Sequence, residues 1–204
     1  MISSLLLFLS FSARASELKS SAKVDSLDAQ AIALLANGHT KEAARIFGRS
    51  IALDPMDARA YANRCTARYQ FGDYSGAIAD FEAATRLAPK LKSSLLALSM
   101  SDAHLQVGQR LIKEGKSDQA VERFYASVRL NRKNSAAYAA IARAALQRGD
   151  FESALSYFDR AIQLDPGEGG FYAGRAKANA ALGRSEQASK DGRRAYELNA
   201  NKQH

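Results

Sequence analysis

Glycines that recur at a nearly fixed distance constrain this chain more than any other feature. They stand at Gly38, Gly72, Gly115, Gly149 and Gly183, with spacings of 34, 43, 34 and 34 residues. The three prolines, Pro55, Pro89 and Pro166, each follow one of these glycines by 17 residues. Glycine accepts the left-handed backbone that ends a helix, and proline cannot donate a helical hydrogen bond. Each unit therefore predicts a helix, a glycine turn, a second helix and a stop.

The unit is clearest between Ser135 and Glu168. Helices are expected over Ala136–Gln147 and Phe151–Leu164, with Gly149 in the turn between them. An alanine follows each turn glycine by five residues, at Ala43, Ala77, Ala120, Ala154 and Ala188. An aromatic residue follows four positions later at Phe47, Phe81, Phe124 and Phe158. Apolar residues at helical spacing predict a buried face on both helices of each unit.

This pattern resembles the tetratricopeptide repeat family, whose 34-residue period carries W-x2-L-G-x2-Y, then A-x3-F, then P. The tryptophan slot holds Leu27, Tyr61, His104, Tyr138 and Tyr172, and the small slot holds Ala31, Cys65, Gly108, Ala142 and Ala176. The resemblance extends over about Val24–Ala200. It implies an all-α, right-handed α-solenoid of antiparallel helix pairs, in which each repeat contacts only its neighbours.

The resemblance divides the chain into five repeats after a short N-terminal region. We expect a signal peptide over 1–15, a linker over 16–23, and repeats over 24–57, 58–91, 92–134, 135–168 and 169–204. The third repeat is nine residues too long, and we expect its first helix to be extended backward, to about Lys92–Lys113; a separate short helix is the alternative. The fifth repeat is degenerate, with Gly192 in the phenylalanine slot, and its polar last helix is expected to cap the array.

The N-terminus predicts export. An apolar run, Leu5–Leu9, is followed by Ala13-Arg14-Ala15, the small-x-small pattern of a cleavage site. The run is too short to span a bilayer, so no transmembrane span is expected in the mature chain. No lysine or arginine precedes the run, which departs from the usual signal peptide. A periplasmic or secreted protein is expected, and a cytoplasmic one is the alternative.

Catalytic chemistry finds no support in the sequence. The histidines, His39, His104 and His204, are not at metal-ligand spacing, and His104 is expected to be packed and half-buried. The single cysteine, Cys65, is expected to be a buried small residue. Acidic residues near helix starts are attributed to the helix dipole: Asp73, Asp80, Asp118, Glu122, Asp150 and Glu152. No catalytic residue, metal site or cofactor is predicted, and the chain is not expected to be an enzyme.

The net charge of +8 is concentrated in the middle of the chain. Between Lys90 and Asn134 nine basic residues face four acidic ones, whereas Ser16–Pro89 is neutral. We define a basic patch by Lys90, Lys92, Arg110, Lys113, Arg129, Arg132 and Lys133. It supports an alternative function as an adaptor for an anionic polymer or membrane surface. Nucleic acid is disfavoured because no exposed aromatic residues alternate with these cations.

In the resembled family the first helix of each repeat lines a concave groove that binds extended peptides or a partner's helix. The matching ladder here is Ile32, Thr66, Gln109, Arg143 and Lys177, flanked by Ala29, Asn63, Gln106, Ala140 and Gly174. The groove candidates are Asn63, Thr66, Gln106, Gln109, Arg143 and Lys177. Arginine offers a fork that matches a carboxylate, so Arg143 with Lys177 suggests an anionic ligand group.

Chaperone-binding members of that family hold a C-terminal carboxylate through a lysine, asparagine and arginine clamp. The matching positions here are Asp28, Ile32, Asn63, Asp102 and Gln106, of which only Asn63 agrees. The two aspartates would repel a carboxylate, so the chaperone clamp is not expected. The sequence therefore predicts a non-enzymatic scaffold that binds an unidentified protein or peptide, in an oligomeric state the sequence leaves open.

Overall fold

The computed structural model describes residues 21–91 and 93–201, and every regular element in them is helical. The first helix covers residues 21–36, so residues 21–23, expected in a linker, already belong to it. The expected signal peptide lies outside the described residues. The helices that follow are α2 (Thr40–Leu53), α3 (Ala58–Gln70), α4 (Tyr74–Leu87), the short 3-10 helix η1 (Pro89–Leu91), α5 (Ser94–Lys113), α6 (Ser117–Leu130), α7 (Ser135–Gln147), α8 (Phe151–Leu164), α9 (Gly169–Ala181) and α10 (Ser185–Ala200). The all-α fold class is confirmed.

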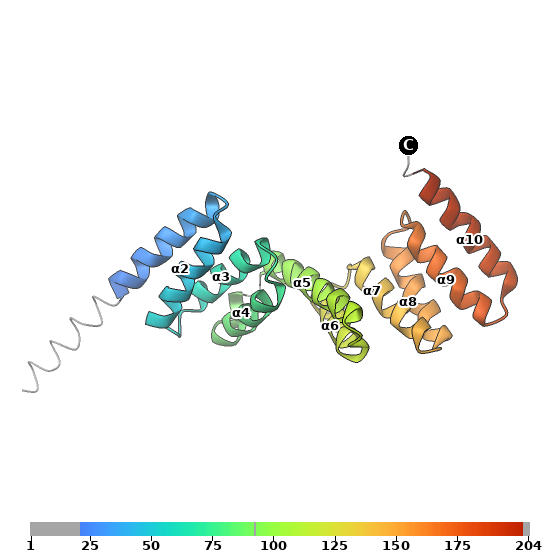
Figure 1. The fold of residues 1–204 in the computed structure, drawn as a ribbon, viewed down its shortest axis with the longest axis horizontal. Coiled ribbons are helices and arrows are strands. Elements are labelled where there is room, and N and C mark those ends of the chain that lie inside the picture. The colour runs from blue at the N-terminus through green and yellow to red at the C-terminus, as the bar shows by residue number, and fades with distance from the viewer. Residues whose placement is uncertain (1–20, 92, 202–204) are drawn as a thin grey trace, which may run out of the picture. The chain divides into compact units, whose positions relative to one another are not determined.

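Turn chemistry sets where these helices end (Figure 1). All five turn glycines adopt positive φ: 80° at Gly38, 85° at Gly72, 75° at Gly115, 77° at Gly149 and 73° at Gly183. At the start of the helices, the side chains of Asp57, Asp73, Asn134 and Asp150 accept hydrogen bonds from backbone N–H groups of the first turn. α8 therefore has the bounds expected from the sequence, and α7 begins one residue earlier than expected, directly after its cap Asn134.

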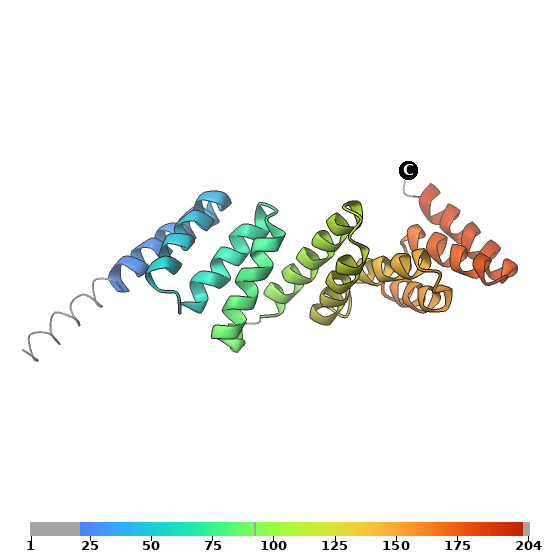
Figure 2. The same cartoon turned by 60° about the horizontal axis from the view of Figure 1, so that its bottom comes forward.

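The described helices form two compact units, which divide between Leu96 and Ala97. In the first unit, the helix of residues 21–36 pairs with α2, and α3 pairs with α4 (Figure 2). Leu27, Ala31 and Phe47 lie in one buried cluster with Ala67 of α3. The tryptophan, small and aromatic slots of the first repeat thus meet in a core shared with the second.

The third repeat is distinguished by the length of its first helix. α5 has 20 residues, whereas α3, α7 and α9 have 13 each. Seven additional residues correspond to about two helical turns. The additional turns lie at the N-terminal end of α5, after η1, and their side chains Leu95 and Leu98 are exposed.

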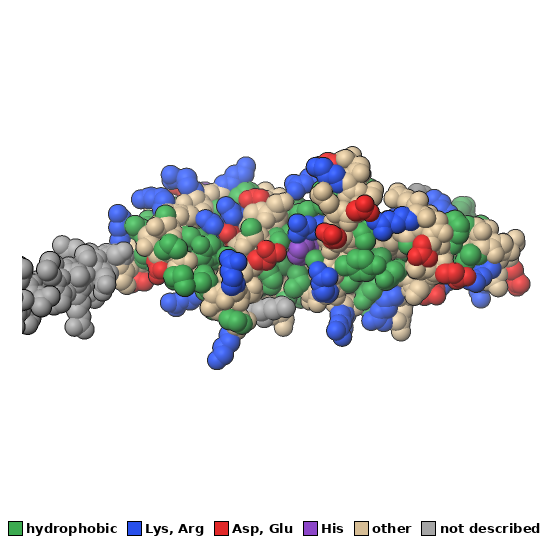
Figure 3. Space-filling view, turned by 90° about the horizontal axis from the view of Figure 1, so that it is seen from below, with side chains coloured by type: hydrophobic (Ala, Val, Ile, Leu, Met, Phe, Trp, Pro, Cys, Tyr) green, Lys and Arg blue, Asp and Glu red, His purple; other side chains and the backbone are tan. Residues whose placement is uncertain are grey.

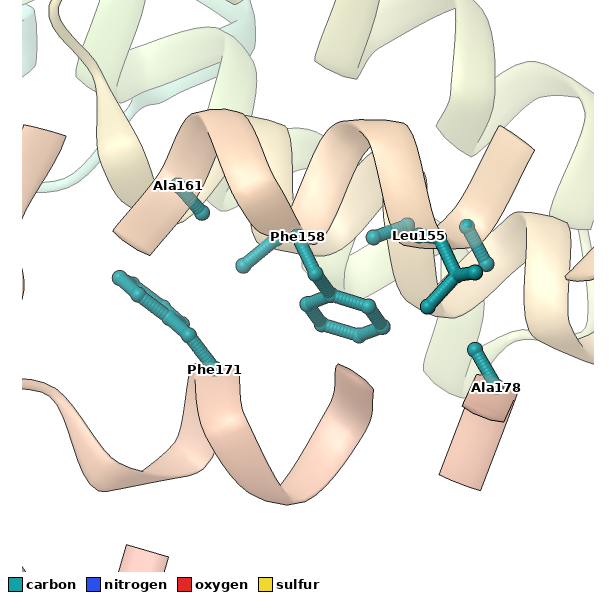
Figure 4. Packing of buried hydrophobic residues seen from close by; sticks show 8 residues of the cluster. Leu155, Phe158, Ala161, Phe171 and Ala178 are labelled. Atoms are coloured by element: carbon teal, nitrogen blue, oxygen red, sulfur yellow. The ribbon is translucent and has the colours of Figure 1, made fainter. Parts of the chain in front are cut away.

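The core of the second unit is built from the aromatic slots and small residues. Phe158 and Leu155 of α8 point toward α9, and Phe171 of α9 lies beside Ala161 of α8 (Figure 4). A Cβ atom at Gly174 would lie 2.2 Å from Phe158, so only glycine lets α9 approach this ring. The opposite holds for Gly192 in α10, where an added Cβ would meet nothing within 4 Å. The last repeat therefore has glycine in its phenylalanine slot at a position where no neighbouring atoms would contact a side-chain Cβ.

Candidate functional site

A pocket between α5 and α7, the first helices of the third and fourth repeats, is the candidate binding site. Its volume is about 310 Å³. It is lined by Gln109, Ile112 and Lys113 of α5, Phe124 of α6, and Ala140, Arg143, Ala144 and Gln147 of α7. Gln109 and Arg143, predicted as neighbours in the groove ladder, line the same pocket. Lys113, predicted as part of the basic patch, lines it with them.

The floor of this pocket is apolar. Phe124 is almost fully buried, and a Cβ atom at Gly108 would lie 2.4 Å from the Cε1 atom of its ring. The absence of a side chain at Gly108 therefore allows the ring to rest against α5. Ala140 and Ala144 of α7 are buried and small, and they complete the apolar floor. An apolar group entering the pocket would replace water over this floor.

The rim of the pocket carries four exposed polar residues in two pairs spaced four residues apart. α5 contributes Gln109 and Lys113, and α7 contributes Arg143 and Gln147. Residues at this spacing share one face of a helix. In the described residues, none of the four side chains has a hydrogen bond or an ion pair within the chain. Their bonding capacity therefore remains available to a ligand.

Burial affects the charged group of Arg143. The residue keeps exposed surface, yet burial of its guanidinium lowers the pKa of Arg143 from its usual value. An arginine remains charged in a protein despite such a decrease. A partly desolvated cation gains more from an anionic partner than a fully hydrated one.

The other predicted groove residues lie elsewhere. Gln106 of α5 donates to Oδ1 of Asp102 at 3.4 Å, and Lys177 is exposed on α9 without lining the α5–α7 pocket. Asn63 and Thr66 are half-buried on α3 in the first unit. The Thr66 hydroxyl donates to the carbonyl oxygen of Ala62 at 3.1 Å, a bond within its own helix. The six candidates are thus distributed over both units.

The basic patch is also divided. Arg110 and Lys113 lie at the C-terminal end of α5, next to the Gly115 turn, whereas Arg129 precedes the far end of α6. Fourteen residues of helix separate those ends by about 20 Å. Arg132 and Lys133 follow α6 at this far end, Lys90 lies in η1 of the first unit, and Lys92 lies outside the described residues. On the face shown in Figure 3, Lys and Arg side chains alternate with acidic and hydrophobic ones.

The structure gives Cys65 and His104 buried positions. Cys65 is fully buried as expected, and burial raises the pKa of its thiol to about 12. His104 is more deeply buried than expected, at 6% exposure, and desolvation together with Arg123 and Arg129 lowers the pKa of its imidazole to about 4. Within residues 21–91 and 93–201, no three side chains among His, Cys, Asp and Glu gather as metal ligands would.

Asp80 corrects one sequence interpretation. Its carboxylate is buried and accepts hydrogen bonds from Arg64 Nε and Nη2 at 2.9 and 2.7 Å, and from Arg68 Nη1 at 2.9 Å. The attribution of Asp80 to the helix dipole is therefore wrong, because it is the centre of an ion-pair network. By contrast, Asp73 and Asp150 do cap helix starts.

A second network repeats this arrangement in the last repeat. Asp191 accepts from Arg175 Nε and Nη2 at 2.9 and 2.6 Å, and from Asn179 Nδ2 at 3.2 Å. The sequence holds a signal for both networks, because the arginine precedes the turn glycine by eight residues and the aspartate follows it by eight. The repeat pattern of apolar slots does not include these charged positions.

The described helices include none that combines the length and the apolar character required to cross a membrane. A family model described as tetratricopeptide repeat matches residues 29–91, 105–169 and 140–202. The tetratricopeptide repeat and J domain-containing co-chaperone DNJ1 of Cryptococcus neoformans is 34% identical over 103 residues, 50% of this chain. This match spans only 18% of the co-chaperone.

Solved structures agree in fold. YrrB, described as a TPR protein with an unusual peptide-binding site, has a TM-score of 0.60 at 20% identity, over 92% of this chain and 91% of YrrB. MamA has a TM-score of 0.58 at 17% identity, over 84% and 95% of the two chains. MamA from Desulfovibrio magneticus RS-1 has a TM-score of 0.57 at 18% identity, over 88% and 96%. The family model covers well over half of the sequence, and the chain belongs to the tetratricopeptide repeat family.

Proposed function

We propose that this chain is a non-enzymatic interaction module whose second unit binds a peptide or a partner's helix between α5 and α7. The observation that carries the proposal is the pocket itself: an apolar floor at Phe124, surrounded by polar side chains without partners in the described chain. Pockets of this construction orient a ligand by polar groups and bury its apolar part. Membership in a family of interaction modules and the peptide-binding site described for YrrB support the same proposal.

The groove extends, in this proposal, toward the fifth repeat. Lys177 occupies the same repeat position on α9 as Arg143 on α7, and these two helices contact each other. A ligand long enough to leave the pocket would pass this exposed cation. Replacing Arg143 and Lys177 together by glutamate is expected to abolish binding of an anionic partner while the helical circular dichroism stays unchanged.

A steric block tests the location of the binding site. Random peptides are selected on the wild-type protein by display, and the affinity of the selected peptides is measured by fluorescence polarisation. In Gln109→Trp, an indole on the rim fills the pocket, and we expect at least a roughly tenfold loss of affinity. Gln119→Trp is the matched control, because Gln119 is equally an exposed glutamine but lies on α6 outside the pocket. Equal affinities of both variants would place the binding site elsewhere.

We also propose that the protein is exported to the periplasm or beyond. Support comes from the apolar run Leu5–Leu9 and the Ala13-Arg14-Ala15 motif. A fusion of residues 1–30 to alkaline phosphatase, which is active only after export, tests this. Activity, together with an N-terminus at Ser16 in the recovered protein, is the expected result. An inactive fusion with Met1 retained would favour the cytoplasmic alternative.

A further inference from the structure

The four rim residues of the pocket form an ordered set. Relative to their turn glycines, Gln109 and Arg143 occupy the same repeat position, and Lys113 and Gln147 occupy the next position along the same face. Each of the two levels therefore combines one amide with one cation. Four residues of helix place the levels about 6 Å apart. This separation is comparable to the length of two residues of extended peptide.

The pocket is electrostatically unbalanced. Its lining contains two cations, Lys113 and Arg143, and no carboxylate. The nearest acid along the chain, Glu114, is already bound by Lys116 Nζ at 2.8 Å and lies 3.9 Å from Arg110. In the described part of the chain, neither Lys113 nor Arg143 forms an ion pair. A ligand that complements this pocket must bring its own negative charge.

The charge lies beside an apolar surface. Phe124, Ala140 and Ala144 form the floor, and Ile112 completes the wall between the two helices. A nucleic acid or another highly charged polymer would leave this surface unused. A carboxylate attached to an apolar group would use both parts of the pocket.

We infer that the pocket binds a peptide segment in which a carboxylate adjoins an apolar side chain, with Arg143 and Lys113 holding the carboxylate. This inference rests on the proposed function and specifies the ligand that the pocket selects. The guanidinium of Arg143 matches the two carboxylate oxygens, and Lys113 adds a second charge. Gln109 and Gln147 each offer a donor and an acceptor, as a peptide bond does, and they pair with the ligand's backbone. The apolar side chain rests on Phe124.

This set of residues differs from the chaperone carboxylate clamp. Read from the first repeat, the clamp positions correspond to Asp28, Ile32, Asn63, Asp102 and Gln106, and none of them lines the pocket. The carboxylate itself has two possible sources in a peptide, its C-terminus and an Asp or Glu side chain. Both supply the same chemistry, and the experiment separates them.

Two libraries of random octapeptides are screened with the full chain. One library is attached through its N-termini and ends in free carboxylates, and the other is attached through C-terminal amides. A terminal carboxylate as ligand predicts enrichment of apolar last residues in the first library alone. A side-chain carboxylate predicts Asp or Glu beside Leu, Ile, Val or Phe in both libraries. Enriched peptides without this combination would overturn the inference.

The affinity of the best peptide is then measured for variants of the two cations. Arg143→Gln and Lys113→Gln are each expected to weaken binding roughly tenfold or more, since each removes a charged hydrogen bond. Arg143→Lys should restore part of the affinity. Arg129→Gln, with the same charge change at the far end of α6, should leave binding unchanged.

The results also separate the inference from the proposed function. Peptides whose binding is lost in Gln109→Trp but retained in Arg143→Gln and Lys113→Gln would support the groove and overturn the carboxylate. Absence of any enriched peptide would overturn both. A labelled oligonucleotide serves as a polymer probe. If its binding alone depended on Arg143, the pocket would belong to an anionic polymer and the inference would fail.

Discussion

Arg64 and Asp80, sixteen residues apart on α3 and α4, form a two-pronged ion pair in which Nε and Nη2 donate to the two carboxylate oxygens at 2.9 and 2.7 Å. Arg68 adds a third bond to Oδ2 at 2.9 Å. The Asp80 side chain is only 3% exposed, so this network lies inside the second repeat. The network links α3 and α4 by ion pairs. In the first repeat the position equivalent to Asp80 is held by Ile46, a buried apolar residue.

We predict that Asp80→Ala destabilises the protein strongly. Removing the carboxylate leaves two partly buried guanidinium groups without their shared acceptor, a change that costs about 3–5 kcal/mol. Urea unfolding followed by circular dichroism measures the free energy of unfolding. Asp118→Ala is the matched control, because Asp118 also pairs with an arginine, Arg148, but is 95% exposed. Its loss is expected to cost less than about 1 kcal/mol. Similar values for both variants would contradict the assigned role of Asp80.

The sequence predicted the helices well because their signals are local. A positive-φ glycine ends the first helix of each repeat, and capping side chains such as Asp73 and Asp150 mark helix starts. These signals are found within one turn of the boundary that they define. The aromatic slots were equally visible, since Phe124 and Phe158 occupy equivalent positions and are both buried.

The candidate site was only half visible in the sequence because it is built between repeats. Gln109 and Arg143 share one repeat position, so the repeat pattern alone predicts them as neighbours. Lys113 and Gln147 lie one helical turn further on, and only the packing of α7 beside α5 brings them to the same pocket. The local excess of positive charge placed Lys113 and Arg129 in one predicted patch. In the structure the length of α6 separates them, because Lys113 precedes the start of α6 and Arg129 lies in its last turn. Pairwise contacts of this kind depend on tertiary structure and not on local pattern.

Two glycines within helices are expected to respond oppositely to the same substitution. At Gly108 an added Cβ would lie 2.4 Å from the Phe124 ring, so Gly108→Ala must displace the ring and costs about 1–3 kcal/mol. At Gly192 the surrounding space is open, and Gly192→Ala is expected to stabilise α10 by up to about 1 kcal/mol. Thermal unfolding of both variants tests the pair. A neutral or stabilising Gly108→Ala would show that the ring is not in close contact.

The thiol of Cys65 is expected to resist modification in the folded protein. Burial and the nearby Asp80 carboxylate raise the pKa of Cys65 to about 12, and the thiolate is the reactive form. Relative to an ordinary thiol, the thiolate population falls by about three orders of magnitude at neutral pH. Labelling with 5,5′-dithiobis(2-nitrobenzoate) is measured with and without urea. An added surface cysteine, Ser156→Cys, provides an internal control that should react at the usual rate. Equal rates for both thiols would contradict burial of Cys65.

His104 is expected to make stability depend on pH in mildly acidic solution. Desolvation, with Arg123 and Arg129 nearby on α6, lowers the pKa of the folded imidazole to about 4, against an ordinary value of about 6.5. Its Nδ1 is buried and has no hydrogen-bond partner in the described chain. Between these two values the unfolded chain binds a proton that the folded chain does not. Stability from the neutral imidazole is therefore complete above pH 6.5 and decreases as the pH falls toward 4.

The expected decrease is about 2 kcal/mol in the free energy of unfolding between pH 7.5 and pH 5. Other titrating groups contribute to the same measurement, so the wild type is compared with His104→Tyr, which places the residue of Tyr61, Tyr138 and Tyr172 in this slot. The variant lacks the imidazole, and its stability should change less over this range. Urea unfolding of both proteins at the two pH values gives the difference directly. Parallel changes would mean that His104 is protonated in the folded state or that its proton affinity is the same in both states.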